Sequence, residues 1–222
     1  MSQQTADPHA HAEVLQAGAP LESANAAVVL IHGRGATAKN ILQLNRHLST
    51  GMDPALRVAF LAPQAAGNTW YPERFIAPLE HNEPWLSSAL AMIDRTVDTI
   101  TAAGVPGTSV MIAGFSQGAC LSLEYVARGS RRLGGAAALS GALIGPTDEP
   151  HAPLADVAGM PVFLGVGEYD DHVAPALVQQ SAELFQEAGA KVDFRFYEAM
   201  GHSMTEDEIV AMRDIIRTLP AE

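Results

Sequence analysis

The chain has 222 residues, of which 48% are hydrophobic, and a formal net charge of −12. This length is expected to form one well-packed domain over residues 1–222, with about residues 1–10 as a disordered tail. The acidic balance repels polyanions, so nucleic acid is not expected as a partner. No stretch approaches the roughly 20 apolar residues that a membrane-spanning helix requires, so no membrane span is expected.

Cysteine usage and the first residues bear on location. Cys120 is the single cysteine and cannot form an internal disulfide. The polar start, Met1 to Pro8, lacks the charged region and the apolar run of a secretory signal. Both observations predict a cytoplasmic location. Cys120 itself is expected to be a small buried apolar residue rather than a nucleophile.

Short apolar runs alternate with longer amphipathic segments along the chain, which is typical of strands alternating with helices. The predicted strands, after a candidate edge strand at His11–Gln16, are Ala27–His32, Arg57–Ala62, Ser109–Phe115, Gly135–Ser140, Pro161–Val166 and Val192–Glu198. The predicted helices are Ala38–Ser49, Trp85–Ala103, Gln117–Arg128, Ala176–Ala188 and Glu206–Leu219. Thr205 followed by Glu208 predicts a capping box for the last helix.

This alternation predicts a doubly wound, mostly parallel sheet with helices on both faces. Such sheets place their chemistry in the loops at the carboxyl ends of the strands. Two segments, Gln64–Glu83 and Gly141–Gly159, fit no regular element. Long loops inside compact domains often bind ligands or cover a site, so both are candidate binding loops.

The strand Ser109–Phe115 runs into Gly114-Phe115-Ser116-Gln117-Gly118, a G-x-S-x-G pattern followed by a predicted helix. A serine at such a sharp turn needs small residues two positions to either side, and Gly114 and Gly118 supply that room. The helix start also directs backbone N–H groups at a reacting carbonyl. The pattern predicts Ser116 as a nucleophile, although without partner residues the same pentapeptide would be only a tight turn.

A serine hydroxyl is a weak nucleophile, so it needs a histidine base, and the histidine needs a carboxylate that orients it. In this strand-turn-helix context the chain order is serine, acid, histidine. His202 is the best-placed base because it lies in the turn between the last strand and the last helix. His151 and His172 are expected to line the surface or the pocket instead.

The acid is expected in the loop after the strand Pro161–Val166. Three carboxylates are candidates there, Glu168, Asp170 and Asp171. Spacing alone does not choose between Asp170 and Asp171, and each of the three carboxylates taken singly could belong to a solvated acidic turn.

A second turn, His32-Gly33-Arg34-Gly35, follows the strand Ala27–His32. It can aim the backbone N–H of Arg34 at the same oxyanion as the N–H of Gln117, so these two donors are predicted to form the oxyanion hole. The side chain of Arg34 either holds an anionic part of a substrate or pairs with a local acid, and the structural role is favoured.

Four motifs in this order resemble the phospholipase and carboxylesterase family of α/β-hydrolases, which includes the acyl-protein thioesterases. They are His32-Gly33-Arg34-Gly35, Gly114-Phe115-Ser116-Gln117-Gly118, the Gly167-x-x-Asp170 turn with Val173, and Gly201-His202. The likeness covers about residues 26 to 219. It implies the α/β-hydrolase fold, with a central mostly parallel sheet, helices on both faces and no large cap domain.

The family pattern G-x-x-D-x-x-V-P places the acid on Asp170. Ala174 stands where the pattern has proline, with Pro175 one place later, which keeps Asp171 as an alternative. Some relatives pair as homodimers, so a homodimer is one expectation for this chain.

The loop that carries Trp70 and Tyr71 resembles the segment bordering the acyl pocket in the bacterial esterases. Both residues are therefore predicted to contact substrate. The alternative, given equal weight, is that this aromatic pair anchors the loop to the core.

Together these residues predict a serine carboxylesterase that hydrolyses carboxylic esters of small or medium acyl chains through an acyl-enzyme on Ser116, with Asp170 and His202. No metal or organic cofactor is required for this chemistry. The alternatives are an acyl thioesterase or lysophospholipase with the same triad and, in another class, a non-catalytic ligand-binding homologue. The acidic surface favours soluble neutral esters as substrates.

Overall fold

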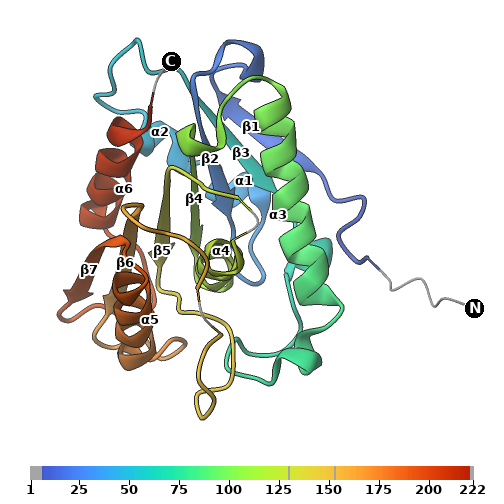
Figure 1. The fold of residues 1–222 in the computed structure, drawn as a ribbon, viewed down its shortest axis with the longest axis vertical. Helices are drawn as coiled ribbons and strands as arrows, with labels where there is room; N and C mark the ends of the chain where they lie inside the picture. Colours follow the sequence, from blue (N-terminus) through green and yellow to red (C-terminus); the bar gives the residue numbers. More distant parts are fainter. Residues whose placement is uncertain (1–6, 130, 153, 221–222) are drawn as a thin grey trace, which may run out of the picture.

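A seven-stranded sheet forms the centre of the protein in a computed structural model that describes residues 7–129, 131–152 and 154–220. The strand order is β1-β3-β2-β4-β5-β6-β7, with β1 antiparallel to β3 and the other neighbours parallel (Figure 1). The doubly wound, mostly parallel sheet predicted from the alternating pattern is confirmed.

The elements follow the predicted order. The strands are β1 Val14–Gly18, β2 Ala26–Ile31, β3 Val58–Pro63, β4 Val110–Phe115, β5 Gly135–Leu139, β6 Pro161–Gly167 and β7 Lys191–Tyr197. The α-helices are α1 Ala38–Ile41, α2 Leu44–Leu48, α3 Trp85–Ala102, α4 Gln117–Arg128, α5 Pro175–Glu187 and α6 Glu206–Thr218. Short 3-10 turns cover Leu21–Ser23, Ala66–Asn68, Leu79–Asn82 and Gly107–Ser109. Among the described residues, no helix is both long and apolar enough to cross a bilayer.

The predicted helix Ala38–Ser49 is wrong in one respect, because the structure divides it into α1 and α2. At the break the backbone N–H of Gln43 donates to the carbonyl of Asn40, three residues back, and the side-chain amide of Asn45 donates to the carbonyl of Leu42. Asparagine competes with the helical backbone in this way, and hydrophobic periodicity does not register the competition.

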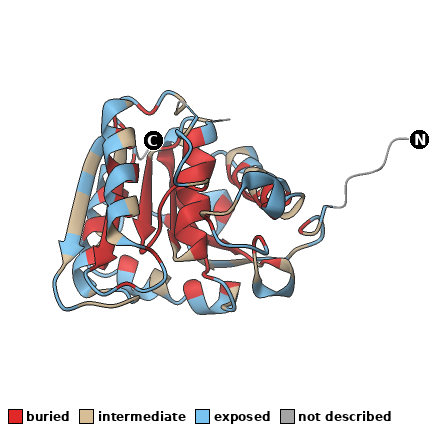
Figure 2. Ribbon diagram, turned by 90° about the horizontal axis from the view of Figure 1, so that it is seen from below, coloured by how far each residue is buried: buried red, intermediate tan, exposed pale blue. Residues whose placement is uncertain are grey.

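Both faces of the sheet are covered, and the alternation of side chains along each strand divides the core into two layers. In β2, Ala27, Val29 and Ile31 pack in the layer of α3, α4 and α5, whereas Ala26, Val28 and Leu30 pack in the layer of α1, α2 and α6. Figure 2 shows the central strands and α4 in the buried colour, with exposed residues on the outer faces of the flanking helices. This two-sided burial explains why strands β2 to β6 are apolar, whereas the edge strand β7 alternates exposed and half-buried residues.

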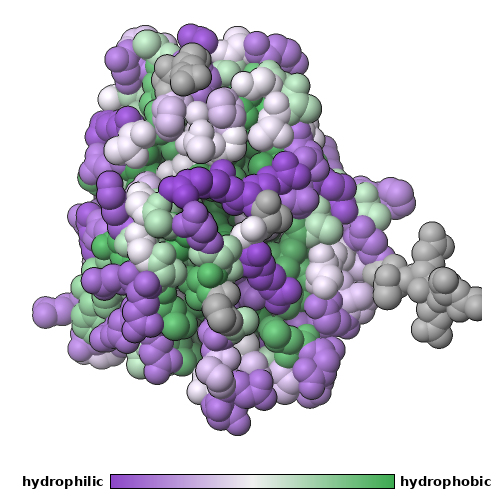
Figure 3. Space-filling view, viewed as in Figure 1, coloured by the Kyte–Doolittle hydropathy of each residue, from purple (hydrophilic) through white to green (hydrophobic). Residues whose placement is uncertain are grey.

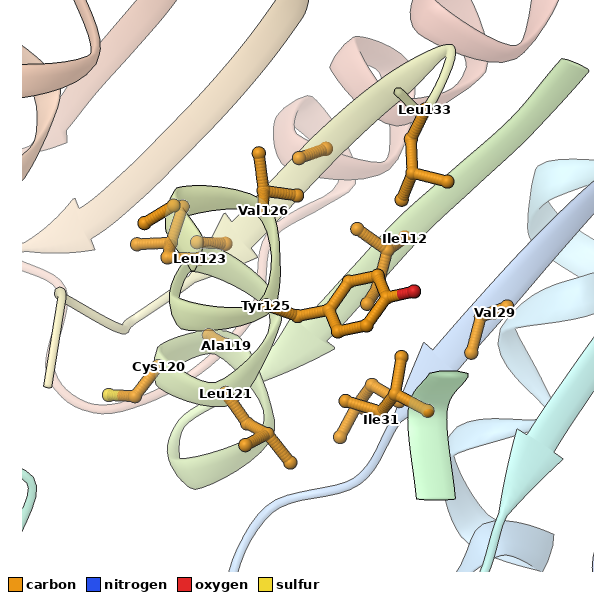
Figure 4. Packing of buried hydrophobic residues seen from close by; sticks show 14 of the residues in the cluster. Val29, Ile31, Ile112, Ala119, Cys120, Leu121, Leu123, Tyr125, Val126 and Leu133 are labelled. Carbon is orange, nitrogen blue, oxygen red and sulfur yellow. The ribbon is translucent and has the colours of Figure 1, made fainter. Parts of the chain in front are cut away.

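Helix α4 lies deepest of the helices, with every residue from Gln117 to Ala127 buried. Figure 4 shows Tyr125 projecting from α4 towards Ile112 of β4 and Ile31 of β2. The Tyr125 hydroxyl donates to Oδ1 of Asp94 on α3 at 2.9 Å. A helix that is buried on all sides is held rigidly by its close-packed surroundings, and α4 therefore gives a fixed base for the turn that precedes it.

The winding of the sheet reverses between β2 and β4. From β2 the chain moves to β3 on one side, and through α3 it returns to β4 on the other side. The register pairs Ile31 with Gly114, so the turns that follow β2 and β4 leave the same edge of the sheet side by side. In doubly wound sheets such a reversal point is the usual position of a binding crevice.

The expectation of a frayed tail needs a correction for residues 7–10, whereas residues 1–6 lie outside the described part. His9 is fully buried. Its Nδ1 accepts a hydrogen bond from the N–H of Ala66, and its Nε2 lies 3.0 Å from the carbonyl oxygen of Trp70. Both hydrogen-bond partners of the His9 ring lie more than 50 residues away, so the local polarity of the segment did not reveal them.

The predicted capping box at α6 is confirmed. The Thr205 hydroxyl accepts from the N–H of Glu208 at 3.3 Å, and Oε2 of Glu208 accepts from the N–H of Thr205 at 2.8 Å. Glu208 is fully buried, and its second oxygen, Oε1, has no hydrogen-bond partner among the described residues. Burial raises the pKa of the Glu208 carboxyl to about 7.

We expect Glu208 to make stability depend on pH. Because the folded-state pKa, about 7, exceeds the ordinary value of 4.5, the carboxyl's contribution is fully present below pH 4.5 and is lost as pH rises through 7. The loss is on the order of 3 kcal/mol. Urea unfolding between pH 5 and 8 should show that Glu208→Gln removes this slope. Glu206→Gln, an exposed change in the same helical turn, should keep it, and equal slopes in all three proteins would contradict the assignment.

Candidate active site

Ser116 occupies a strained turn between β4 and α4. Its backbone angles are φ 56° and ψ −120°, in a region that non-glycine residues rarely adopt. A methyl group added at Gly114 would lie 2.3 Å from the backbone of Gly118, and one added at Gly118 would lie 2.2 Å from the carbonyl oxygen of Ile31. Both glycines are therefore required by contact between backbones, as the G-x-S-x-G pattern predicts.

Ser116, His202 and Asp170 form a continuous hydrogen-bonded line. The Ser116 Oγ lies 2.8 Å from Nε2 of His202, and Nδ1 of His202 lies 2.8 Å from Oδ2 of Asp170. An ionised carboxylate only accepts, so the imidazole proton is assigned to Nδ1, and Nε2 is left to accept the serine proton. The three residues come from the loops after β4, β6 and β7, which meet at one edge of the sheet.

Asp170 is held in its charged form. Burial raises the pKa of its carboxyl, but hydrogen bonds from His202 and from the backbone N–H groups of Val173 and His172 together bring the pKa below its ordinary value. The two backbone bonds to Oδ1 measure 2.9 and 3.0 Å. Asp171, the alternative acid, is 81% exposed at its side chain and pairs with Nδ1 of His172 at 2.7 Å. Only Asp170 of the two contacts His202 among the described residues.

The third candidate acid, Glu168, links the loops that carry Asp170 and His202. Its Oε2 accepts from the N–H of Ala199 at 2.9 Å, which ties the loop after β6 to the loop after β7. Glu168 therefore helps to position the two loops.

The two residues whose backbone N–H groups are predicted to bind the oxyanion belong to the lining of the cavity that contains Ser116. Arg34 and Gln117 both line this cavity, and Gln117 is the first residue of α4, where backbone N–H groups have no acceptor within the helix. Gly33 lies close to the serine, since a methyl group there would come within 3.4 Å of the Ser116 side chain. The turn that carries the Arg34 N–H therefore packs directly against the turn at Ser116.

A buried histidine fixes that first turn. Nδ1 of His32 lies 2.8 Å from the carbonyl oxygen of Gly33, and its Nε2 accepts from the N–H of Ala65 at 3.1 Å. Burial lowers the pKa of His32, which favours the neutral ring that this arrangement requires. His32 thus joins the turn after β2 to the loop after β3.

The cavity around Ser116 has a volume of about 350 Å³. A larger cavity of about 890 Å³ lies beside it, and Phe75 lines both. The larger one is lined by the predicted irregular segment after β5 and by α5, and His151 lies in its wall at 3.4 Å from Oε2 of Glu124. Figure 3 shows hydrophobic surface in the lower half of the viewed face, around the loop that follows β5. His172 lines the smaller cavity.

Trp70 and Tyr71, for which one role is predicted, have different surroundings in the structure. Trp70 is fully buried, its indole N–H donates to the carbonyl oxygen of His32 at 2.8 Å, and it is not among the described residues that line either cavity. The expectation that Trp70 contacts substrate is therefore corrected, because the indole anchors its loop to the core. Tyr71 is also buried but lines the cavity around Ser116.

The sequence predicts a role only for the backbone of Gln117, but its side chain also contributes to the site. Its Oε1 accepts from the N–H of Trp70 at 3.0 Å, and its Nε2 donates to the carbonyl of Tyr71 at 2.8 Å. The residue after Ser116 therefore fixes the loop at the wall of the cavity through two hydrogen bonds. Nothing in the local pattern distinguishes this amide from an ordinary helical glutamine.

Two further side chains at the cavity bear on its chemistry. Cys120 is buried, and burial raises the pKa of its thiol to about 12, so it stays protonated as expected for a small core residue. Among the described residues, Asp170, His172 and His202 form a group whose potential metal-ligating atoms lie within 4.8 Å of one another. Asp170 and His202 already use those atoms in the hydrogen-bonded line.

The sheet topology, the strained serine between β4 and α4, and the absence of a large cap among the described residues define the α/β-hydrolase class. The chain belongs to the phospholipase/carboxylesterase family, whose model matches residues 9–220. This confirms the resemblance and the fold class inferred from the four motifs.

Several relatives are similar to this chain over different lengths. A crystal structure of a phospholipase/carboxylesterase from Dyadobacter fermentans has a TM-score of 0.83 at 38% identity, covering 92% of this chain and 96% of that one. Acyl-protein thioesterase 1 of Debaryomyces hansenii is 36% identical over 50% of this chain and 49% of its own length. The chain thus spans about half the length of the first curated relatives that it matches. Acyl-protein thioesterase 1 of Saccharomyces cerevisiae is 26% identical over 91% of this chain and 96% of its own.

The strained backbone angles of Ser116 should lower the free energy of unfolding, and this effect can be measured by substitution. Ser116→Gly removes the side chain that opposes a positive φ, so it should be more stable than Ser116→Ala by about 1 kcal/mol, a strain relief partly offset by glycine's greater freedom when unfolded. Urea unfolding of both variants at one pH checks this. Lower stability of the glycine variant would mean that the turn is relaxed in solution.

Proposed function

We propose that the protein is a serine carboxylesterase that hydrolyses carboxylic esters of small or medium acyl chains through an acyl-enzyme on Ser116. The single observation that carries the proposal is the line from Ser116 through His202 to Asp170, with 2.8 Å at each step. Family membership places the chain among carboxylesterases and acyl-protein thioesterases.

The proposed reaction has two halves. Nε2 of His202 takes the proton of Ser116 while Oγ attacks the ester carbonyl carbon, and the resulting oxyanion accepts hydrogen bonds from the N–H groups of Arg34 and Gln117. The C–O bond then breaks, and the alcohol leaves with the proton from His202. Water, deprotonated by His202, attacks the acyl-enzyme, and the carboxylic acid leaves as Ser116 recovers its proton. Asp170 stays ionised and holds the imidazole throughout.

A thioesterase is the second candidate, supported by the names of several curated relatives, which are acyl-protein thioesterases. The same three side chains would act on a thiol leaving group. A lysophospholipase would also use them, and the shape of the cavity decides between these substrates.

The first test measures hydrolysis of p-nitrophenyl esters from acetate to laurate, with intact-mass detection of a fluorophosphonate adduct. We expect turnover and a single adduct in the wild-type protein, and neither in Ser116→Ala. Matched oxygen and thiol esters of the preferred acyl chain then distinguish the esterase from the thioesterase. A wild-type protein that neither turns over nor reacts would overturn the proposal in favour of a non-catalytic binding role.

The role of Asp170 has a matched control in its neighbour. Asp170→Asn should lower kcat by on the order of 10⁴, because the amide no longer fixes the imidazole tautomer. Asp171→Asn, at an exposed position one residue away, should change kcat by less than about threefold, since surface changes away from such networks have small effects. Similar losses in the two variants, measured on one p-nitrophenyl ester, would remove Asp170 from the mechanism.

A further inference from the structure

The cavity around Ser116 carries charge of the opposite sign to the chain as a whole. The chain has 25 Asp and Glu against 13 Lys and Arg. Among the described residues that line this cavity, however, the charged side chains are Arg34 and Arg74, accompanied by His172 and His202, and none is acidic. The chain as a whole is acidic, yet in the part that the structure describes two arginines and no carboxylate line the cavity around Ser116. This local reversal of charge requires a physical reason.

Arg34 is held in place by neutral groups. Its Nη1 donates to the carbonyl of Pro72 at 2.7 Å and its Nη2 to the carbonyl of Glu73 at 2.6 Å. Its guanidinium carbon lies 6.0 Å from the centre of the Tyr71 ring. These contacts orient the guanidinium without cancelling its charge, and a guanidinium has five N–H donors, more than these two bonds use. The alternative of pairing with a local acid does not occur among the described residues.

Arg74 is similar. It is exposed, and its Nη2 donates a long hydrogen bond of 3.4 Å to the carbonyl of His172 across the cavity. Within the described part of the chain, neither Arg34 nor Arg74 forms an ion pair with a carboxylate. Of the nine other arginines, Arg46 and Arg57 also form none with described residues, and seven do, namely Arg95, Arg128, Arg131, Arg132, Arg195, Arg213 and Arg217.

Two like charges facing one small cavity repel each other, and a carboxylate between them would relieve that repulsion. Guanidinium groups match the planar geometry of a carboxylate and bind it through paired hydrogen bonds. The cavity of about 350 Å³ has room for a small ligand, and Ser116, Arg34 and Arg74 all line it. The overall acidity slows the approach of an anion, but the field inside a cavity follows its own lining.

We propose that the preferred substrates are small esters that carry a free carboxylate, such as monoesters of short dicarboxylic acids, with the carboxylate bound between Arg34 and Arg74. This inference rests on the proposed esterase function and narrows its substrate class. The carboxylate takes no part in bond making, so hydrolysis proceeds by the two half-reactions given above. The expectation of neutral esters, which came from net charge alone, does not take account of this lining.

The test compares monomethyl glutarate, which carries a free carboxylate, with dimethyl glutarate, in which a neutral methyl ester replaces it. Initial rates, expressed per ester bond, are followed by pH-stat titration at pH 7.5 in low salt, before the diester's product accumulates. The wild-type ratio of kcat/KM, monoester over diester, should be about 10 or more, because hydrogen bonds to a charged group are among the stronger ones. Arg74→Gln and Arg34→Gln should each lower this ratio roughly tenfold. Arg46→Gln makes the same change at an exposed position outside both cavities and should keep the ratio. Sodium chloride at 0.5 M should lower the wild-type ratio.

A second readout does not depend on turnover of either ester. Glutarate should slow fluorophosphonate labelling of Ser116 in the wild-type protein, and the neutral diamide of glutaric acid at the same concentration should not. Arg34→Gln also loses the bonds to Pro72 and Glu73, so the thermal unfolding of this variant is measured as well. If Arg34→Gln does not fold, the conclusion rests on Arg74→Gln.

The outcomes separate the two proposals. Hydrolysis of the diester with a wild-type ratio near 1, or a ratio that Arg74→Gln leaves unchanged, would overturn the carboxylate site and leave the esterase intact. Loss of both turnover and labelling in the wild-type protein would overturn the esterase, and the inference with it.

Discussion

The start of α4 lies against the ends of β2 and β4 at a distance that only glycine permits. A side chain at residue 118 would overlap the backbone of β2, and one at residue 114 would overlap α4 itself. This contact forces Ser116 into its unusual backbone angles and directs the first turn of the helix over the reversal point of the sheet. The position of Ser116, the place of Gln117 at the start of α4 and the packing of Gly33 all follow from one steric constraint.

Around this contact, buried polar side chains join loops that are distant in the chain. His32 joins the turns after β2 and β3, Gln117 joins α4 to the loop that carries Trp70, and Asp170 joins the loop after β6 to His202. Each of these bonds has little water around it, so it is stronger and more costly to break than the same bond at the surface. The arginines differ, because they meet solvent and neutral carbonyls, and this leaves their charge available to a ligand.

Most of the fold could be predicted because strands β2 to β6 are buried on both faces and are apolar, so their limits follow from composition to within about two residues. The turn at Ser116 could also be predicted, since local geometry requires glycine at positions 114 and 118. The break between α1 and α2 could not, because it depends on one asparagine side chain. Asp170 and Asp171 are identical in type and adjacent, so spacing left both open. They differ because Asp170 is buried and bonded to His202 whereas Asp171 is exposed, and that difference is a property of the folded chain.

His9 shows how far the support of a reaction centre can extend. The ring bonds the backbone of Ala66 and Trp70, and Trp70 in turn bonds His32, which steadies the turn bearing the Arg34 N–H. The segment ahead of β1 thus supports the turn that carries one of the two proposed oxyanion donors, although it lies far from Ser116 in the chain. Shortening the protein to its sheet and helices, a routine step in preparing a minimal domain, would remove that support while leaving every proposed reacting group in place.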